Sequence, residues 1–323
     1  MTLLRAAVVG AGYLGRFHAQ KYAAAGSDGV RLAAVVDPDL ARARAVVAET
    51  GADAEVFASH RDVLGKVDIA SIAAPTTLHH DVARDLLEAG VDVLVEKPIT
   101  STVAEADALV DLARARGRIL QVGHLERFNK AIVEAGRAIQ RPGFIEAHRL
   151  GPFVDRGTDV DVVLDLMIHD LDIILALVRS PVEDIQAVGV PVLTGEADIA
   201  NARITFASGC VANVTASRVS MKKQRKIRVF ERDAYLSIDY DAQAVEIVNR
   251  RLGEDGAPYL DARSLVIERG DSLAEEIRAF IVCCRKRERP LVSGEDARDA
   301  LALAEAIRAR YDKRLLALAK GEG

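Results

Sequence analysis

The chain has 323 residues, half of them hydrophobic, and is long enough to form two domains of ordinary size. Its 43 basic and 48 acidic residues give a formal net charge of −5, which excludes a global attraction to nucleic acid or to an anionic membrane surface. We therefore expect small-molecule partners. No apolar run is long enough to span a membrane and no export signal is visible, so we expect a cytoplasmic protein.

The three cysteines, Cys210, Cys283 and Cys284, form neither a CxxC pair nor an even set for disulfide bonds. This pattern suits a reducing compartment and argues against a structural zinc site. We expect three buried thiols and no metal.

Up to about residue 123, short runs of Val, Ile and Ala alternate with longer amphipathic stretches. The continuous apolar character of the short runs predicts strands that are buried on both faces. The expected strands are Leu4–Val9, Leu32–Asp37, Ile69–Ala73, Val91–Val95 and Ile119–Val122. The expected helices between them are Leu40–Thr50, His80–Ala89 and Val103–Arg116. This order predicts a first domain, residues 1–123, with a doubly wound parallel sheet.

After residue 123, alternating patterns and turn signals replace the continuous apolar runs. The expected strands are Asn201–Phe206, Cys210–Ser217, Lys226–Phe230 and Ala234–Ile238. The expected helices are Asp161–Val178, Leu273–Arg285 and Asp296–Ala317. We therefore expect a second α/β domain, residues 124–323, with a large, mostly antiparallel sheet and a last helix that can pack back on the first domain. An open apolar face on that sheet would favour a homodimer or homotetramer.

A GxGxxG motif at residues 10–15 follows the first expected strand and opens the first helix. Gly10 permits a tight turn, Gly12 lets backbone amides approach a pyrophosphate, and Gly15 permits close packing of helix on strand. An ordinary glycine turn is the alternative, but Asp37 ends the next expected strand, where an acidic residue can accept hydrogen bonds from an adenosine ribose. The motif therefore predicts a dinucleotide-binding Rossmann domain.

Asp37 also bears on the choice of cofactor. A carboxylate at this position would repel the 2′-phosphate of NADP, so it favours NAD(H). Arg42 and Arg44 lie about one helical turn downstream and keep NADP open as the less favoured cofactor, although both also fit a solvated helix face.

Three side chains suit the chemistry that a nicotinamide cofactor performs. Oxidation of a secondary alcohol needs a proton acceptor and a cation that stabilises the developing alkoxide. Lys97 follows an expected parallel strand, and the four-residue spacing of Asp165 and His169 places both on one helix face. The alternatives are a solvent-exposed lysine and a surface pair on the helix, for which Asp161 or Asp172 would serve equally as the partner of the histidine.

The Glu96-Lys97-Pro98 segment, joined to the glycine motif, resembles the Gfo/Idh/MocA dehydrogenases, which include glucose-fructose oxidoreductase and inositol dehydrogenase. The resemblance covers essentially the whole chain, including residues 74–79 (APTTLH) and 165–169 (DLMIH). It implies an NAD-dependent dehydrogenase of CH–OH groups in which Lys97, Asp165 and His169 are catalytic and the histidine accepts the proton. With the glycine motif, it implies a cofactor pocket formed by Gly10, Gly12, Tyr13, Leu14, Gly15, Asp37, Pro75, Thr76, His79, Glu96 and Pro98.

The segment GHLERFN at residues 123–129 resembles the GHxERFNP signature of members that act on nucleotide-activated N-acetyl sugars, particularly at the 3-hydroxyl of UDP-N-acetylglucosamine. Lys130 replaces the final proline, and residues 156–161 and 198–203 agree further with these members. The substrate-binding residues implied are His124, Arg127, Asn129, Arg156, Thr158 and Asp172. Candidates to bind the pyrophosphate of a UDP-sugar are Arg127, Arg149, Arg156 and Arg218.

The leading hypothesis is therefore oxidation of UDP-N-acetylglucosamine at C3 to a 3-keto sugar, which would feed an aminotransferase in lipid A-type envelope sugar synthesis. The first alternative is a dehydrogenase of a free polyol or sugar such as an inositol, which would use the same three catalytic residues. The second is a regulatory protein that binds NAD(H) without catalysis. Three intact catalytic groups argue against the second alternative.

Overall fold

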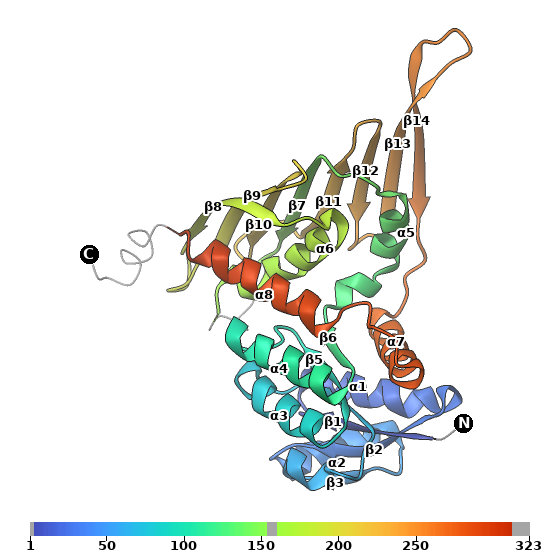
Figure 1. The fold of residues 1–323 in the computed structure, drawn as a ribbon, viewed down its shortest axis with the longest axis vertical. Helices are drawn as coiled ribbons and strands as arrows, with labels where there is room; N and C mark the ends of the chain where they lie inside the picture. The colour runs from blue at the N-terminus through green and yellow to red at the C-terminus, as the bar shows by residue number, and fades with distance from the viewer. Residues whose placement is uncertain (1–2, 154–159, 312–323) are drawn as a thin grey trace. The chain divides into compact units, whose positions relative to one another are not determined.

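The computed structural model describes residues 3–153 and 160–311, and the chain divides into two compact units (Figure 1). Unit 1 comprises Met1–Phe128 and Asp271–Asp299, and unit 2 comprises Asn129–Gly270 and Ala300–Gly323. The expected boundary at residue 123 lies shortly before the end of the first segment. The segment 271–299 differs from the expectation, because it belongs to unit 1 and not to the second domain.

Unit 1 is built on a parallel sheet with six strands among the described residues, in the order β3-β2-β1-β4-β5-β6. Its strands are β1 (Leu4–Val9), β2 (Val30–Val36), β3 (Glu55–Phe57), β4 (Ile69–Ile72), β5 (Asp92–Glu96) and β6 (Leu120–Gly123). Its helices are α1 (Tyr13–Ala24), α2 (Leu40–Thr50), α3 (Thr76–Glu88), α4 (Val103–Arg116), α7 (Ser272–Lys286) and the first part of α8 (Gly294–Arg308), with the 3₁₀ turns η1 (Ala25–Asp28), η2 (His60–Val63) and η3 (Leu125–Phe128). This is the expected doubly wound Rossmann sheet.

Helices cover both faces of this sheet. Helix α1 contacts α2 and α7, and α3 contacts α4. The segment from residue 271 joins unit 1 because α7 contributes Ile277, Phe280 and Ile281 to the same buried cluster as Tyr22 of α1. Burial of these large apolar side chains, which the sequence pattern alone could not assign to a particular core, holds the helix in place.

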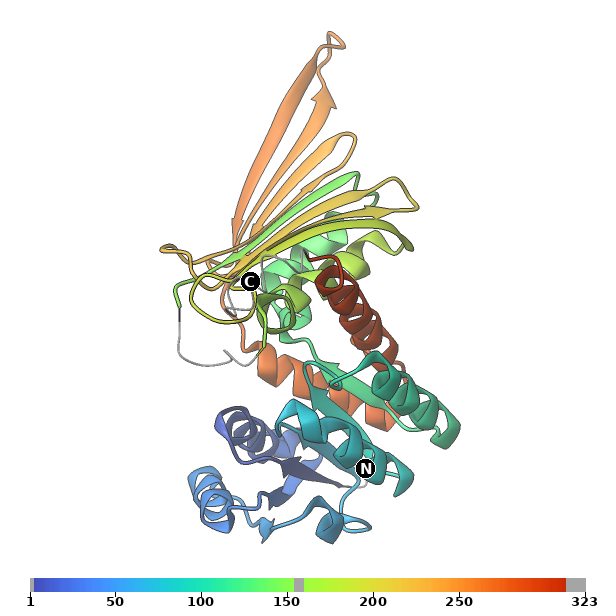
Figure 2. The same cartoon turned by 90° about the vertical axis from the view of Figure 1, so that its left-hand side faces the viewer.

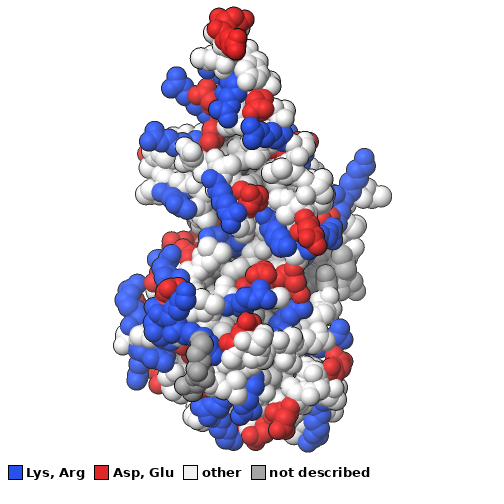
Figure 3. Space-filling model, turned by 90° about the vertical axis from the view of Figure 1, so that its right-hand side faces the viewer, with Lys and Arg blue, Asp and Glu red and all other residues white. Residues whose placement is uncertain are grey.

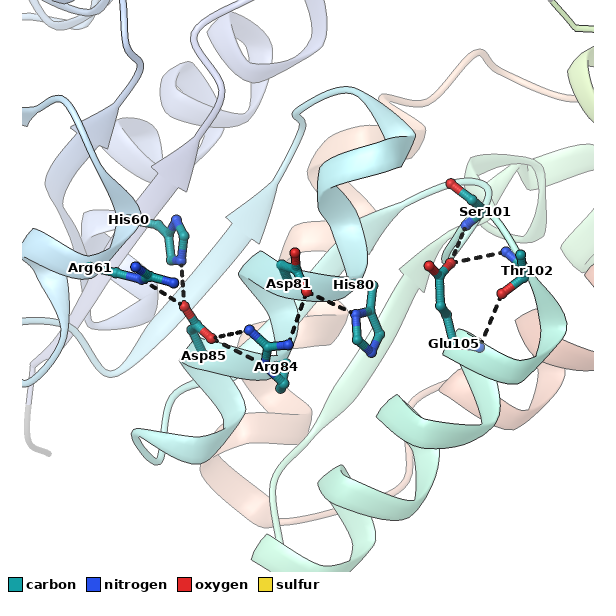
Figure 4. Close-up of polar contacts among 9 residues, drawn as sticks. All are labelled: His60, Arg61, His80, Asp81, Arg84, Asp85, Ser101, Thr102 and Glu105. Atoms are coloured by element: carbon teal, nitrogen blue, oxygen red, sulfur yellow. Dashed lines mark hydrogen bonds and ion pairs between the residues drawn. The ribbon is translucent and has the colours of Figure 1, made fainter.

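Local signals in the sequence set where α4 begins and ends, and Figure 4 shows the contacts at its start. Helix α4 begins with a capping box, in which the Thr102 hydroxyl accepts from the Glu105 amide and the Glu105 carboxylate accepts from the Thr102 amide. Gly117 ends the same helix with a φ of 60°. These contacts explain why the expected bounds of this helix are confirmed.

On α3, Asp85 accepts hydrogen bonds from His60, Arg61 and Arg84 (Figure 4). Burial would raise the pKa of Asp85, but these three bonds lower it well below its usual range.

Unit 2 is built on a sheet with eight strands among the described residues, in the order β14-β13-β12-β11-β7-β10-β9-β8. Its strands are β7 (Phe144–Leu150), β8 (Val182–Val190), β9 (Ile199–Phe206), β10 (Val211–Ser217), β11 (Gln224–Phe230), β12 (Ala234–Asp239), β13 (Ala244–Leu252) and β14 (Pro258–Val266). Strands β7 and β10 pair in parallel, and the other ladders of the described strands are antiparallel. The expected large, mostly antiparallel sheet is confirmed.

Helices α5 (Lys130–Ala138) and α6 (Ile168–Val178) cover one face of this sheet (Figure 2). A π-helical turn, η4 (Val163–Met167), leads directly into α6. Inward side chains such as Ile145, Val214 and Ile227 are fully buried in the core below these helices. The alternation of buried and half-buried residues along β7 and β10 gives this sheet one core face.

The outward positions of the central strands are mostly polar, although Phe144 of β7 and Phe230 of β11 pack together on this face, with ring centroids 5.7 Å apart. This mixed face differs from the open apolar face that was expected. Glu146 forms an ion pair with Arg228 across β7 and β11, and Asn201 donates a hydrogen bond to Thr215 across β9 and β10. Charged and polar side chains at alternate positions make cross-strand pairs instead of a hydrophobic surface. Assembly into a homo-oligomer stays a prediction.

The surface in view in Figure 3 carries intermixed basic and acidic side chains, in keeping with the small net charge. No helix of the described residues is both long and apolar enough to cross a membrane.

The prediction of three buried thiols is confirmed for Cys210, Cys283 and Cys284.

Candidate active site

The glycine loop of unit 1 lies between β1 and α1, as expected. Gly10 has a φ of +96°, and a Cβ placed on it would lie 2.6 Å from the Ala73 carbonyl oxygen, so only glycine fits. A Cβ on Gly15 would lie 1.7 Å from the Gly10 oxygen. Gly12 is different, because a Cβ there would meet nothing within 4 Å. The tight packing therefore fixes the turn around Gly10 and Gly15 and leaves the backbone at Gly12 accessible to a pyrophosphate.

Asp37 follows β2 at the same edge of the sheet and is 6% exposed. One carboxylate oxygen accepts from the Ala11 amide at 2.8 Å, and the other accepts from the Asp39 amide at 2.8 Å. Arg42 lies near, with its Nη1 3.7 Å from the carboxylate. Asp37 is thus fixed against the glycine loop, in the position that the dinucleotide motif requires.

Tyr13 and Leu14 begin α1 and are 70% and 45% exposed. Pro75, at the N-cap of α3, is exposed, and Thr76 is the half-buried first residue of that helix. These four apolar or hydroxyl side chains are accessible at the ends of β1 and β4, which are neighbours in the sheet. Ligands of open α/β sheets bind beyond such strand ends.

His79 is 1% exposed, and its imidazole lies between two backbone carbonyls. Its Nδ1 is 2.9 Å from the Pro98 oxygen, and its Nε2 is 2.9 Å from the Ala74 oxygen. Both ring nitrogens therefore contact the protein itself. His79 therefore links the loop after β4 to the turn after β5 and does not line an open pocket.

Glu96 ends β5, and Lys97 and Pro98 begin the turn that follows, with a cis peptide bond between them; all three residues are half-buried. The Glu96 carboxylate lies 2.8 Å from His18 Nε2. A Cβ placed on Gly123 would lie 2.9 Å from the Glu96 carboxylate, so the glycine leaves room for it. His18 was not among the predicted site residues, because a histidine within a helix gives no signal of this contact.

His124 and Arg127 follow β6 in the same unit. His124 is 1% exposed, and burial together with the positive charges of Lys97 and Arg127 lowers its pKa to about 3. His124 is therefore neutral near pH 7. Arg127 is half-buried and donates a hydrogen bond to the Leu291 carbonyl at 3.3 Å.

Asp165 and His169 belong to unit 2, on η4 and at the start of α6. Both side chains are half-buried, and Asp172, one turn further along α6, is 2% exposed. Asp161, the other alternative partner, accepts from the Val163 amide at the start of η4 and forms an ion pair with Arg308. A π turn next to a candidate catalytic pair is typical of functional sites.

Arg149 and Arg218 have structural partners, which the sequence analysis could not foresee. Arg149 binds Asp170 through two hydrogen bonds, with Nε 2.9 Å and Nη2 3.1 Å from the carboxylate oxygens. The Tyr240 hydroxyl also donates to Asp170. Arg218 donates to the Val160 carbonyl and lies 3.5 Å from Asp198. Both arginines are about 5% exposed or less, so we do not assign them to a pyrophosphate.

Asn129 is a helix cap. Its Oδ1 accepts from the Ala131 amide at 3.0 Å and from Gln243 at 2.9 Å, and its Nδ2 donates to the Tyr240 carbonyl at 3.1 Å. These contacts involve both ends of its amide. Arg156 and Thr158 lie outside the described residues. The described residues contain no cluster of His, Cys, Asp and Glu suited to a metal ion.

Comparison with known proteins places these residues in a family. The model of an oxidoreductase family with an NAD-binding Rossmann fold matches residues 4–124, and the model of the GFO/IDH/MocA C-terminal domain matches residues 134–237. The UDP-N-acetylglucosamine 3-dehydrogenase of Acidithiobacillus ferrooxidans is 40% identical over 310 residues, which cover 95% of this chain and 97% of that protein.

A solved structure of a UDP-N-acetylglucosamine 3-dehydrogenase from the same organism matches with a TM-score of 0.89 and 38% identity, covering 98% of this chain and 100% of that one. The myo-inositol 2-dehydrogenase of Thermotoga maritima is 24% identical over 96% of this chain and 97% of that protein. The chain therefore belongs to the Gfo/Idh/MocA family and is a dehydrogenase of CH–OH groups with a Rossmann domain for a nicotinamide cofactor.

Proposed function

We propose that this protein oxidises the 3-hydroxyl of UDP-N-acetylglucosamine to a 3-keto sugar with NAD⁺. The observation that carries the proposal is the 40% identity to a UDP-N-acetylglucosamine 3-dehydrogenase along 95% of the chain, because it extends through both units. The inositol dehydrogenase of comparable coverage is more distant, at 24% identity. The product, a ketone, is a substrate for an enzyme that transfers an amino group.

In this proposal, His169 accepts the proton of the reacting hydroxyl, and Asp165 orients and supports the charge of its imidazole. The ammonium group of Lys97 stabilises the negative charge that develops on the oxygen. A nicotinamide cofactor bound at the glycine loop would supply the acceptor for the hydride that leaves C3 of the sugar. Lys97 lies near His124, and its positive charge contributes to the lowered pKa of that histidine.

The residues around the glycine loop fit a dinucleotide. Gly12 leaves open the space that a side chain would occupy, and the buried Asp37 carboxylate lies against the Ala11 amide. A carboxylate at this point favours the free ribose hydroxyls of NAD⁺ over the phosphate of NADP⁺. The exposed Arg42 beside it is the feature that would favour NADP⁺.

The test follows the formation of NADH by its absorbance when the purified protein is mixed with NAD⁺ and UDP-N-acetylglucosamine. A carbonyl trap removes the keto product and so drives the reaction toward oxidation. Parallel reactions use myo-inositol and NADP⁺. We expect turnover with the UDP-sugar and NAD⁺ and its loss in Lys97→Ala, whereas the exposed Lys222→Ala retains it. Turnover of myo-inositol alone would identify a polyol dehydrogenase, and no turnover with any substrate would contradict the proposal.

Asp37 gives a second test. In Asp37→Ala, the repulsion of a 2′-phosphate is removed while Arg42 remains, so the ratio of kcat/KM for NADP⁺ to that for NAD⁺ should rise about tenfold or more. An unchanged ratio would show that Asp37 does not select the cofactor.

A further inference from the structure

Glu276 is a deeply buried carboxyl group that the proposed reaction does not use. Its side chain is 0% exposed, and among the described residues neither of its carboxyl oxygens has a hydrogen-bond partner. An ionised carboxylate is strongly disfavoured in such a place, because it has lost its hydration and gained no donor in return. A neutral carboxylic acid is compatible with the same surroundings.

The position of Glu276 on α7 is fixed from both sides. Its neighbour Ile277 and the nearby Phe280 are buried in the core of unit 1. The side-chain amide of Gln121, on β6, donates a hydrogen bond of 3.2 Å to the Glu276 carbonyl. The helix therefore cannot turn the carboxyl group toward water without exposing these apolar side chains.

A second carboxyl group, that of Glu96, acts on Glu276. Burial and the negative charge of Glu96 raise the pKa of Glu276 well above its usual value. Glu96 differs in two ways, because it contacts His18 Nε2 at 2.8 Å and its side chain is 13% exposed. It also precedes Lys97 in the chain. Of the two carboxyl groups, Glu96 has the surroundings that favour the negative charge.

The other titratable and charged groups near this part of α7 come from the elements that contact it. They are Tyr13, Arg16, His18, Lys21 and Tyr22 of α1, Asp28 of η1, His124 after β6, Glu126 and Arg127 of η3, and Glu275, Arg278, Cys283, Cys284, Arg285 and Lys286 of α7 itself. Lys21 pairs with Asp271 and Asp28 lies near Arg278, at exposed positions along the helix. His124 is neutral near pH 7, as described above.

We propose that Glu96 and Glu276 act as an acid pair with a single negative charge, in which the fully buried Glu276 holds the proton and the half-buried Glu96 the charge. Glu276 is then a positioning residue: because its side chain stays neutral, it adds no second negative charge near Glu96, and the charged Glu96, which contacts His18 and lies against Gly123, fixes the turn that carries Lys97. The role of this pair in placing Lys97 rests on the proposed function, whereas the location of the proton on Glu276 is independent of it.

The proposal predicts a particular pH dependence of stability. A carboxyl group that binds its proton more tightly in the folded state favours folding fully at pH values below its unfolded-state pKa. That advantage is lost as the pH rises toward the folded-state pKa, because the unfolded chain releases the proton and the folded chain retains it. The contribution of Glu276 to the free energy of unfolding should therefore decrease steadily as the pH rises from mildly acidic to mildly alkaline values. A glutamine at this position has no proton to release and lacks this dependence.

The experiment compares the melting temperatures of the wild type, Glu276→Gln and Glu275→Gln between about pH 5 and pH 8, without substrate or cofactor. Glu275 is the exposed neighbour on the same helix and serves as the matched control. We expect the melting temperature of Glu276→Gln, relative to the wild type, to rise steadily with pH, while that of Glu275→Gln shows no such rise. A relative melting temperature of Glu276→Gln that stays constant or falls with pH would overturn the proposal.

Two further measurements complete the test. The infrared spectrum of the wild type with ¹³C-labelled glutamate should show a protonated carboxyl group near pH 8; its absence would overturn the proposal even if Glu276→Gln failed to fold. In turnover, Glu96→Gln should lower kcat by about tenfold or more and Glu276→Gln by less than about threefold, because only Glu96→Gln removes a charge. Equal losses would contradict the assigned location of the charge. A wild type without turnover would refute the proposed function and leave the stability result intact.

Discussion

The two units hold their candidate catalytic residues by different means. In unit 1, Lys97 follows directly from a buried strand, so the backbone of the sheet places it. In unit 2, Asp165 and His169 lie on η4 and α6, whose positions depend on contacts between distant parts of the chain, such as Arg149 with Asp170. A site at a strand end therefore follows from local sequence, whereas a site on a helix depends on the partners that hold the helix.

The largest expected effect on stability comes from removing the ion pair that supports α6. Arg149→Leu leaves the fully buried Asp170 without its ion-pair partner, which should lower the free energy of unfolding by about 3–5 kcal/mol. Arg203→Leu, at an exposed position of the same sheet, is the control and should cost less than about 1 kcal/mol. Urea unfolding measures both. Similar losses in the two variants would contradict the idea that this buried pair holds unit 2 together.

This difference between the units also decides how much the sequence could predict. The strand Leu4–Val9 and the helices Leu40–Thr50 and Val103–Arg116 have the expected bounds, because continuous apolar runs and capping residues are local signals. The short strand β3 was not predicted, since three residues give too little pattern. Strands β13 and β14 were also missed, because their exposed, charged positions obscure the alternation.

In the candidate site, too, the residues marked by local sequence signals could be predicted and those placed by long-range packing could not. The motif residues around Gly12, Asp37 and Lys97 are contiguous or follow strands, so their places were predictable. The burial of Arg149 against Asp170, and of Glu276 near Glu96, depends on long-range packing. No spacing in the sequence separates these buried side chains from arginines and glutamates on a solvated surface.

Within the glycine loop of unit 1, Gly10 and Gly12 should differ in their effects on stability and on cofactor affinity. Gly10→Ala should lower both stability, by about 1 kcal/mol or more, and cofactor affinity, because its Cβ would meet the Ala73 backbone at a positive φ. Gly12→Ala should leave stability within about 0.5 kcal/mol and weaken NADH binding about tenfold, since its Cβ would enter open space. Thermal unfolding and NADH fluorescence titration measure the two properties. A stable Gly12→Ala that binds NADH normally would show that the pyrophosphate lies elsewhere.

A further effect on stability is expected from the ion-pair cluster on α3. Asp85→Asn removes charged acceptors for His60, Arg61 and Arg84 and should cost about 1–3 kcal/mol near pH 7. Because the pKa of Asp85 is lowered in the folded state, its contribution is present above the unfolded-state pKa and is lost as the pH falls through the folded-state value. The difference in melting temperature between the two proteins should therefore shrink on acidification. A difference that grows instead would mean that the cluster does not hold the carboxylate ionised.

The central claim is the proposal that His169 accepts the proton of the reacting hydroxyl of a UDP-sugar. The most direct measurement is the rate of NADH formation from UDP-N-acetylglucosamine by His169→Asn, with His148→Asn, on the outer face of the sheet, as the control. We predict that kcat falls by about 10²–10⁴ in His169→Asn and changes little in His148→Asn. A His169→Asn variant with the wild-type rate would contradict the account, because the proton would then be accepted elsewhere.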